Sequence, residues 1–254
     1  MAFETVLFET ADGVATITLN RPDVLNAFND TMAHEFRAIW ERVRTDEDIR
    51  AVVIRAAGDR AFCTGIDRET AAWWDSNIWN QEDPGEWFGA KANRVWKPVI
   101  AAVHGMCAGG AQYFINEADI IICSDEATFF DPHQNIGLVS ALEPIGMLAR
   151  GVPLGDVLRW ALLGTEERIT ASTALRLGLV TEVVPRAQLW DRADALAKRI
   201  AARRPEAVQG TVKAIWEALD VPRSVALARG MSYPLLGNPP EGFAPTGNDK
   251  PEFR

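Results

Sequence analysis

The stretch KPVIAAVHGMCAGGAQ, residues 97–112, contains the turn from a predicted strand to a predicted helix that decides the fold. Its first part, PVIAAVHG, is an apolar run typical of a buried strand. Gly109 and Gly110 follow, where a helix is predicted over about 110 to 117. The N–H groups in the first turn of a helix lack acceptors within it, so they can hold a negative oxygen, including an oxyanion that forms only during a reaction. Close packing of the strand against the helix would also explain the two glycines.

A second glycine turn strengthens the functional interpretation. DRAFCTGIDRE, residues 59–69, follows an apolar strand predicted over 51–58. The segment from Thr64 to Asp67 again places a free backbone N–H after an apolar run. Together the two corners could direct two donors at one carbonyl oxygen.

The remaining pattern is that of an α/β protein. Strands are predicted at TVLFE, VATITL, 98–105, 118–124 and 127–131, and a helix over 29–46 is capped by Asn29 or Asp30. After residue 153 helical signals dominate, with Thr170 as an N-cap, a short strand at VTEVV and three helices over about 186–233. We therefore expect an α/β core at 1–190 and a helical C-terminal region with a tail at 191–254, which takes part in oligomerisation.

Composition excludes several classes of function. The net charge of −9 argues against nucleic-acid binding, which needs clusters of Lys and Arg. The beginning, MAFETVLFET, has no features of a secretion signal, and no run of about 18 apolar residues could span a membrane, so a cytoplasmic protein without a membrane partner is expected.

The cysteines and histidines predict neither disulfides nor a metal site. Cys63, Cys107 and Cys123 are odd in number, lack CxxC spacing and lie in or beside apolar runs, which favours buried, reduced thiols. The three histidines are scattered along the chain, so no metal ligand set is predicted.

Six segments, taken in order, resemble the crotonase (enoyl-CoA hydratase/isomerase) superfamily. They are NRPDVLNAF (20–28), RAFCTGIDR (60–68), KPVIAAVHGMCAGGAQ (97–112), ADIIICSDEATFFDPH (118–133), ITASTALRLGLVTEVVP (169–185) and the late helices. The resemblance covers about residues 5–235. It implies a crotonase-like spiral of β-β-α units, a homotrimer or homohexamer, and an acyl-CoA substrate. Coenzyme A is then part of the substrate, and no permanently bound cofactor is expected.

The resemblance also implies a binding site. By position in the motifs, the N–H groups of Ile66 and Gly110 would hold the thioester carbonyl oxygen. Coenzyme A would contact Val24, Leu25 and Ala27, with its adenine near Ile66, Asp67 and Arg68. Arg60 and Arg68 would face its phosphates, although both could equally be solvated surface residues.

The chain departs from the family at two catalytic positions. Family hydratases carry one glutamate where Tyr113 stands and a second where His133 stands. Adding water across a conjugated double bond needs one group to deprotonate water and another to protonate the α-carbon. A tyrosine is a poor base at neutral pH but can donate a proton, whereas a histidine can act as a base. Tyr113 could instead be a packing aromatic.

Two carboxylates near His133 could compensate for the missing glutamates. Glu143 follows His133 by ten residues, and Asp131 precedes it by two, which places Asp131 and His133 on one face of an extended segment. Either could orient His133 or act directly. The alternatives are that Glu143 caps a helix beginning near Pro144 and that Asp131 is a turn residue.

Five of the nine tryptophans fall between residues 73 and 96, namely Trp73, Trp74, Trp79, Trp87 and Trp96. In the family this region borders the acyl group, so the aromatic density favours a bulky or ring-containing acyl chain. A contact between subunits of a trimer would explain it as well.

Three classes of function follow from the sequence. The first is a lyase or isomerase acting on an enoyl-CoA through an enolate, with a non-standard acid/base set. The second is a hydrolase of a carbon–carbon bond in a β-diketone or ring ketone, using His133 and a carboxylate. The third is a catalytically silent acyl-CoA binder.

Overall fold

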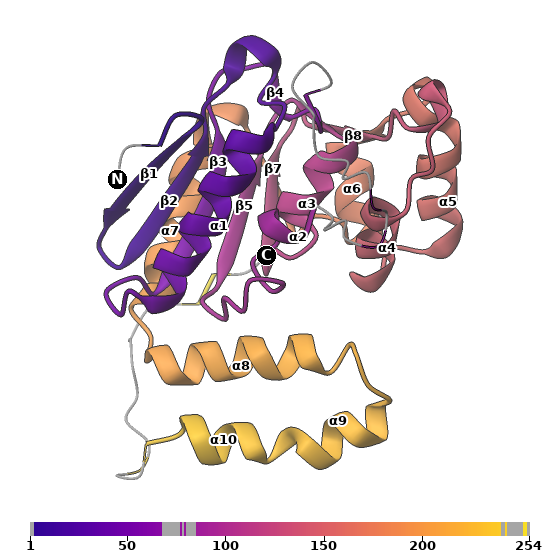
Figure 1. The fold of residues 1–254 in the computed structure, drawn as a ribbon. Coiled ribbons are helices and arrows are strands. Elements are labelled where there is room, and N and C mark those ends of the chain that lie inside the picture. Colours follow the sequence, from indigo (N-terminus) through magenta and orange to yellow (C-terminus); the bar gives the residue numbers. More distant parts are fainter. Residues whose placement is uncertain are drawn as a thin grey trace.

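The chain folds around a six-stranded sheet with strand order β1-β2-β3-β5-β7-β10 (Figure 1). The computed structural model describes residues 3–67, 77, 79, 85–239, 242 and 251–252. The strands are β1 (Val6–Ala11), β2 (Val14–Leu19), β3 (Ala51–Ala56), β5 (Val99–Val103), β7 (Ile120–Ser124) and β10 (Glu182–Val184). β1 and β2 are antiparallel, joined by the turn at Asp12 and Gly13, and all later neighbours pair in parallel.

Helices cover both faces of this sheet, which explains why its central strands β3, β5 and β7 are mostly apolar. α1 (Asp30–Thr45) packs on one face through a stripe that includes Met32, Phe36 and Trp40. Its N-cap is Asn29, whose side chain accepts a hydrogen bond from Met32 N, as predicted. α7 (Leu189–Ala201) covers the other face with Leu189 and a row of alanines.

A second, smaller sheet has the order β4-β6-β8-β9. Its strands are β4 (Ala61–Cys63), β6 (Met106–Ala108), β8 (Thr128–Phe130) and β9 (Ile169–Thr170). The chain passes repeatedly from a strand of the large sheet to a strand of the small one and then to a helix. The units β3-β4, β5-β6 and β7-β8 therefore stack in parallel, which is the predicted spiral of β-β-α units. The short strands β4 and β6 were not predicted as separate elements.

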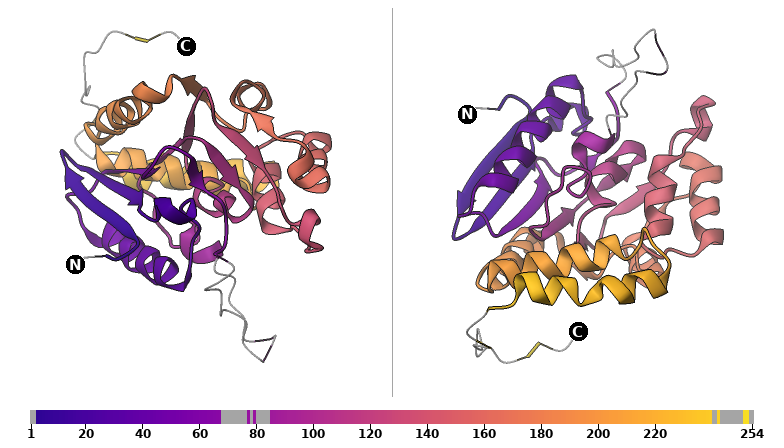
Figure 2. Two further views of the ribbon diagram at one scale, coloured as in Figure 1. Left: turned by 90° about the horizontal axis from the view of Figure 1, so that it is seen from above. Right: turned by 60° about the horizontal axis from the view of Figure 1, so that its bottom comes forward.

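The helices after the spiral units form two groups. α4 (Leu142–Ala149) and α5 (Leu154–Leu163) lie on one side of the molecule, followed by α6 (Ala171–Leu177), whose N-cap is Thr170 as predicted. α8 (Pro205–Glu217) lies beneath the sheet, and α9 (Arg223–Gly230) and α10 (Ser232–Gly237) run back beside it (Figures 1 and 2).

The region from 186 to 233 thus contains the start of a fourth helix, where three were predicted. The helix is interrupted at Met231, which separates α9 from α10. The proposed division at residue 190 falls inside α7, which packs on the large sheet. No helix in the described ranges has the length and apolar character needed to cross a membrane.

Candidate active site

The two glycine corners meet in space. The chain leaves β4 at Gly65, and it leaves β6 at the 3₁₀ turn Gly109–Ala111, which leads into α3 (Gln112–Ile115). A methyl group on Gly65 would lie 3.1 Å from the amide nitrogen of Gly110. Gly65 also has φ +87°, a conformation that favours glycine. The first corner therefore needs glycine both for its backbone shape and for its close approach to the second.

The N–H group of Ile66 is turned away from Phe28. On either side of it, Gly65 O accepts from Phe28 N at 2.9 Å and Asp67 N donates to Phe28 O at 2.8 Å. Successive N–H groups of extended chain point to alternate sides, so the Ile66 N–H is directed away from Phe28. Within the described residues no acceptor takes this hydrogen.

The N–H group of Gly110 is the second free donor. It belongs to the first turn of a helical segment, where N–H groups have no partner in the helix, and no other described group accepts from it. A side chain at Gly110 would lie 2.8 Å from the ring of Phe28, which is buried. The predicted pair of donors is therefore assembled from two strand ends, with Phe28 packed against both.

His133 lies next to this pair and contacts two carboxylates. A methyl group on Gly109 would be 3.6 Å from Cε1 of the His133 ring. His133 Nδ1 hydrogen-bonds Asp131 Oδ1, which also accepts from the backbone N–H of His133 at 3.0 Å. On the other side of the ring, Nε2 lies 3.8 Å from Oε1 of Glu143. The structure thus brings together the three side chains that the sequence placed within thirteen residues.

Both carboxylates are buried, with residue exposures of 0% for Asp131 and 3% for Glu143. Burial raises the pKa of Asp131, but the hydrogen bonds from His133, together with the nearby Ser140 hydroxyl, outweigh it and hold the pKa below its ordinary value of 3.8. Asp131 is therefore an ionised acceptor that favours the tautomer of His133 with its proton on Nδ1.

Glu143 does not cap its helix. α4 begins at Leu142, and its N-cap is Ala141, which makes no side-chain cap. The Glu143 side chain instead points inward to His133, and only Met147 accompanies it among the buried residues of α4. Asp131 likewise bonds His133 rather than acting only in a turn.

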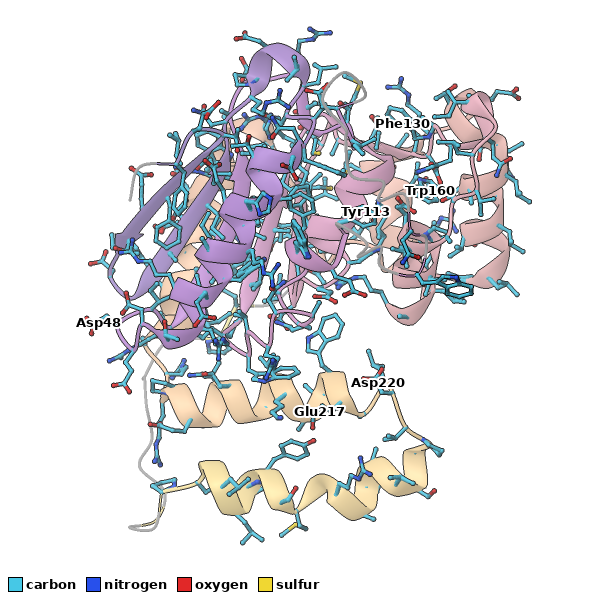
Figure 3. The ribbon with its side chains drawn as sticks, viewed as in Figure 1. Asp48, Tyr113, Phe130, Trp160, Glu217 and Asp220 are labelled. Atoms are coloured by element: carbon cyan, nitrogen blue, oxygen red, sulfur yellow. The ribbon has the colours of Figure 1, made fainter. Side chains whose placement is uncertain are left out.

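Tyr113 lies at the edge of the same site. It is half-buried on α3, and its Cε2 would be 3.3 Å from a methyl group on Gly110. Its ring centroid is 5.9 Å from that of Phe28. Figure 3 places Tyr113 in the middle of the molecule, between the sheet with α1 and the helices α4 and α5. Both the packing contact and a position beside the donors are therefore present.

The segment predicted to hold coenzyme A is built around two residues that the sequence analysis missed. Arg21 ion-pairs with Asp67 at 2.8 Å and donates to the backbone oxygen of Ala27 at 2.6 Å. Asn26, which is buried and has φ +54°, donates to Ala57 O and Ala61 O at 2.9 and 3.0 Å. Both residues lie in the quoted NRPDVLNAF motif, and an asparagine after an apolar residue in a loop is a signal for such a left-handed turn.

A surface pocket of 340 Å³ adjoins this segment and includes the predicted residues Leu25 and Arg60 in its lining. Val24 beside it is 44% exposed, and Ala27 is buried. Asp67, which was predicted to lie near the adenine, forms its ion pair with Arg21. Arg68 lies outside the described residues, as do Trp73 and Trp74.

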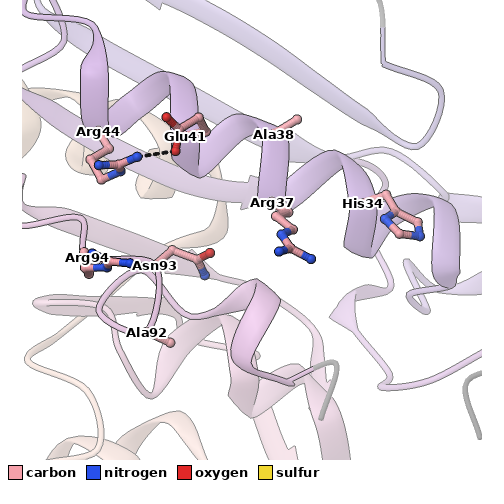
Figure 4. Close-up of a pocket in the computed structure, with 8 residues that line it drawn as sticks. All are labelled: His34, Arg37, Ala38, Glu41, Arg44, Ala92, Asn93 and Arg94. Atoms are coloured by element: carbon pink, nitrogen blue, oxygen red, sulfur yellow. Dashed lines mark hydrogen bonds and ion pairs between the residues drawn. The ribbon is translucent and has the colours of Figure 1, made fainter. Parts of the chain in front are cut away.

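A larger pocket of 470 Å³ contains none of the predicted site residues (Figure 4). It lies between α1 and the 92–94 loop, where Arg37, Arg44 and Arg94 point into it and Glu41 pairs with Arg44. Its lining is exposed and charged, and it offers neither free backbone donors nor a buried acid or base. The features predicted for a catalytic site therefore lie at the glycine corners and not in this pocket.

The tryptophans that the structure describes do not form one wall. Trp79 is 88% exposed, Trp87 contacts His34 with ring centroids 5.1 Å apart and the rings tilted, and Lys213 lies over Trp96. The three cysteines are buried and unpaired, as predicted. Within the described residues no group of three or more His, Cys, Asp or Glu side chains could hold a metal ion.

Comparison with known proteins agrees with this geometry. The family described as enoyl-CoA hydratase/isomerase matches residues 9–231. The chain is 33% identical over 241 residues to the (E)-benzylidenesuccinyl-CoA hydratase of Thauera aromatica, covering 91% of this chain and 88% of the relative. It is 35% identical over 216 residues to the carnitinyl-CoA dehydratase of Proteus mirabilis, covering 82% and 78%.

Solved structures show the same fold. The crystal structure of an enoyl-CoA hydratase/isomerase from Mycobacterium paratuberculosis superposes with a TM-score of 0.83 at 38% identity, covering 91% of this chain and 89% of that one. A hydratase subunit from Geobacillus kaustophilus gives 0.82 at 29% identity, covering 92% and 90%. The crotonase-like fold predicted from the sequence is confirmed.

Proposed function

Because the chain belongs to the enoyl-CoA hydratase/isomerase family, we propose that it hydrates or isomerises a bulky enoyl-CoA with His133, its two carboxylates and Tyr113 in place of the usual pair of glutamates. The observation that carries this proposal is the position of His133, which is held between buried Asp131 and Glu143 beside two free backbone donors. A base, a charge partner and an oxyanion site thus lie in one place.

In hydration, the thioester oxygen lies between the N–H groups of Ile66 and Gly110. A distance of 3.8 Å between His133 Nε2 and Glu143 Oε1 is too long for a direct hydrogen bond and suits one water shared by the two groups. His133 takes a proton from this water as its oxygen bonds the β-carbon. The π electrons of the double bond move onto the thioester oxygen, and the resulting enolate is held by the two donors.

Completion of the reaction requires a proton on the α-carbon, which Tyr113 supplies from its hydroxyl. The enolate collapses to the thioester as the new C–H bond forms, and the proton held by His133 returns to Tyr113 through solvent. While His133 is charged, Asp131 and Glu143 stabilise the imidazolium from both sides. Isomerisation uses the same enolate without addition of water.

The coenzyme A part of the substrate is assigned to the segment that carries Val24, Leu25 and Ala27. Arg60 lines the adjacent 340 Å³ pocket and is exposed, so it can pair with a phosphate. Asp67 supports this segment through its ion pair with Arg21. No permanently bound cofactor is needed for the reaction proposed.

We further assign a homotrimeric or homohexameric state. α4 and α5 expose Ile145, Leu154 and Leu162 by about three-fifths each, and α10 exposes Leu235 and Leu236 by 79% and 86%. Apolar side chains on adjacent helices in this number are typical of a subunit interface. Light scattering coupled to size exclusion tests the assignment, and a monomer at micromolar concentration would refute it.

The test of function is a panel of enoyl-CoA esters, from crotonyl-CoA to aryl-substituted ones, followed by loss of the conjugated thioester absorbance and by product mass. We expect a mass gain of one water with at least one bulky ester. If the protein binds coenzyme A esters but consumes none of them, the proposal is overturned. The carbon–carbon hydrolase and the silent binder draw no support from the relatives described above.

A further inference from the structure

α4 carries Glu143, yet few apolar contacts hold this helix in place. Of its eight residues only Glu143 and Met147 are buried. Leu142, Ile145 and Leu148 are exposed by 41%, 60% and 45%. Since Met147 is the one apolar side chain that α4 buries, the position of the Glu143 carboxylate also depends on polar contacts to the rest of the chain.

Those polar contacts converge on the end of α3. The side chain of Asn116, which is 8% exposed, donates from Nδ2 to the backbone oxygen of Glu143 at 3.0 Å. Arg150 at the C-terminus of α4 donates from one guanidinium nitrogen to Asn116 O and Ala118 O at 3.1 and 2.6 Å. Both ends of α4 are therefore tied to the turn that follows α3.

The close approach at Asn116 is built into the sequence of α4. A methyl group on Gly146 would lie 2.0 Å from Nδ2 of Asn116, so any other residue there would displace the amide. The amide orientation follows from its contact, because the opposite orientation would set Oδ1 against the Glu143 carbonyl oxygen. Asn116 thus hydrogen-bonds the backbone of Glu143, the residue whose carboxylate faces His133.

We propose that Asn116 is a positioning residue for Glu143, which sets the distance between the Glu143 carboxylate and Nε2 of His133. Asn116 also lies one helical turn after Tyr113. The segment from the 3₁₀ turn to the end of α3 therefore carries Gly110 and Tyr113 near its start and contacts α4 through Asn116 at its end. The kinetic part of this inference rests on the hydration or isomerisation proposed above.

The first test replaces the Asn116 amide with apolar side chains that cannot donate a hydrogen bond. The variants are Asn116→Ala and, to keep the volume, Asn116→Leu. Asn93→Ala is the matched control, because Asn93 also donates from Nδ2 to backbone oxygens, those of Glu86 and Gly89 at 2.8 and 2.7 Å. We expect kcat on the best ester to fall about 10-fold or more in both Asn116 variants, within the range for loss of acid/base support, with KM changed less than about 3-fold. Asn93→Ala should leave both unchanged.

The second test needs no substrate. Ring-proton NMR of the histidines follows His133, assigned with His133→Gln, as a function of pH. The described carboxylates facing this ring are Asp131 and Glu143. A displaced Glu143 disfavours the charged ring, so the His133 titration midpoint should fall by about half a pH unit or more in Asn116→Ala, as in Glu143→Gln, and stay fixed in Asn93→Ala.

The two tests separate the failure of this inference from the failure of the proposed function. An unchanged His133 titration in both Asn116 variants overturns the positioning role whether or not any ester is hydrated. A shifted titration in a protein that consumes no ester supports the positioning role and leaves the proposed reaction refuted. If kcat falls and KM rises by the same factor while the His133 titration is unshifted, Asn116 is a structural residue only.

Discussion

At the scale of single residues, glycine has two separate tasks in the site. Gly65 needs its left-handed conformation, and it also leaves room for the Gly110 amide. Gly110 has no positive φ, and glycine is required there because the rings of Phe28 and Tyr113 leave no room for a side chain. The two effects can be separated, since other glycines of the chain have a positive φ without any close neighbour.

Gly65→Ala tests the oxyanion site with a matched control. Gly178→Ala carries a similar strain, at φ +77° against +87°, but its methyl group meets nothing within 4 Å. Both variants should lose about 1–2 kcal/mol of unfolding free energy, measured in urea. Only Gly65→Ala should also lose turnover, by about 10²-fold, because its methyl group crowds the Gly110 N–H. Equal activity in the two variants would remove Gly65 and Gly110 from the oxyanion site.

Asp131→Asn tests how the histidine is oriented. The amide can present either its oxygen or its NH₂ group to His133, so the proton is no longer fixed on Nδ1 and Nε2 is no longer reserved as the base. Turnover should fall by about 10²-fold or more, with KM little changed. Asp125→Asn, an exposed residue just after β7, is the control. A KM effect without a kcat effect would assign Asp131 to binding instead.

At the scale of elements, the apolar periodicity of the sequence predicted the large sheet, α1 and the cap at Asn29 well, because each buries a clear stripe or face. β4, β6 and β9 were missed, since strands of two or three residues carry no period, whereas the equally short β8 and β10 stand in runs rich in aromatic or β-branched residues. The glycine corners were found from the free N–H groups expected there, His133 from the resemblance, and Asp131 and Glu143 from their spacing to His133. Arg21 and Asn116 were missed because their roles depend on contacts to residues 46 and 27 positions away, which no local pattern encodes.

The attachment of α8 to the core is a further contact between distant residues. Trp216 donates from its indole nitrogen to Asp119 Oδ1 at 2.6 Å, while Asp119 Oδ2 accepts from Lys91 Nζ at 2.8 Å and from Val99 N at 2.7 Å. Asp119 is therefore satisfied only when α8 is docked. Loss of one such bond to a charged group costs about 1.5–3 kcal/mol.

Trp216→Phe should consequently increase amide hydrogen exchange in α8 while exchange in the large sheet stays slow. The increase corresponds to a loss of about 2 kcal/mol in local protection. Trp79→Phe, at a side chain that is 88% exposed, serves as the control. Unchanged protection of α8 would show that its apolar contacts hold it without this bond.

At the scale of the whole molecule, stability should depend on pH through His104, which is fully buried. Burial and, next, the charge of Arg186 lower the pKa of His104 from 6.5 to about 4. Between these pH values the unfolded chain binds a proton that the folded chain does not. Stability from this group is thus complete above pH 6.5 and is lost as pH falls toward 4, by up to roughly 3 kcal/mol.

Urea unfolding between pH 4 and 7 measures this loss. His104→Asn should lose less stability than wild type as the pH falls through that window, whereas His34→Asn, at an exposed histidine, should run parallel to the wild-type curve. Parallel curves for wild type and His104→Asn would show that His104 is protonated alike in both states.

The central claim is that His133, held by two carboxylates beside the backbone donors, performs the base chemistry. The most direct measurement is the single-turnover rate of the best enoyl-CoA ester with wild type and with His133→Gln, alongside the affinity of both proteins for coenzyme A. We predict a rate about 10²–10⁴-fold lower in the variant with an unchanged coenzyme A affinity. A variant that turns over the ester at the wild-type rate would contradict the account.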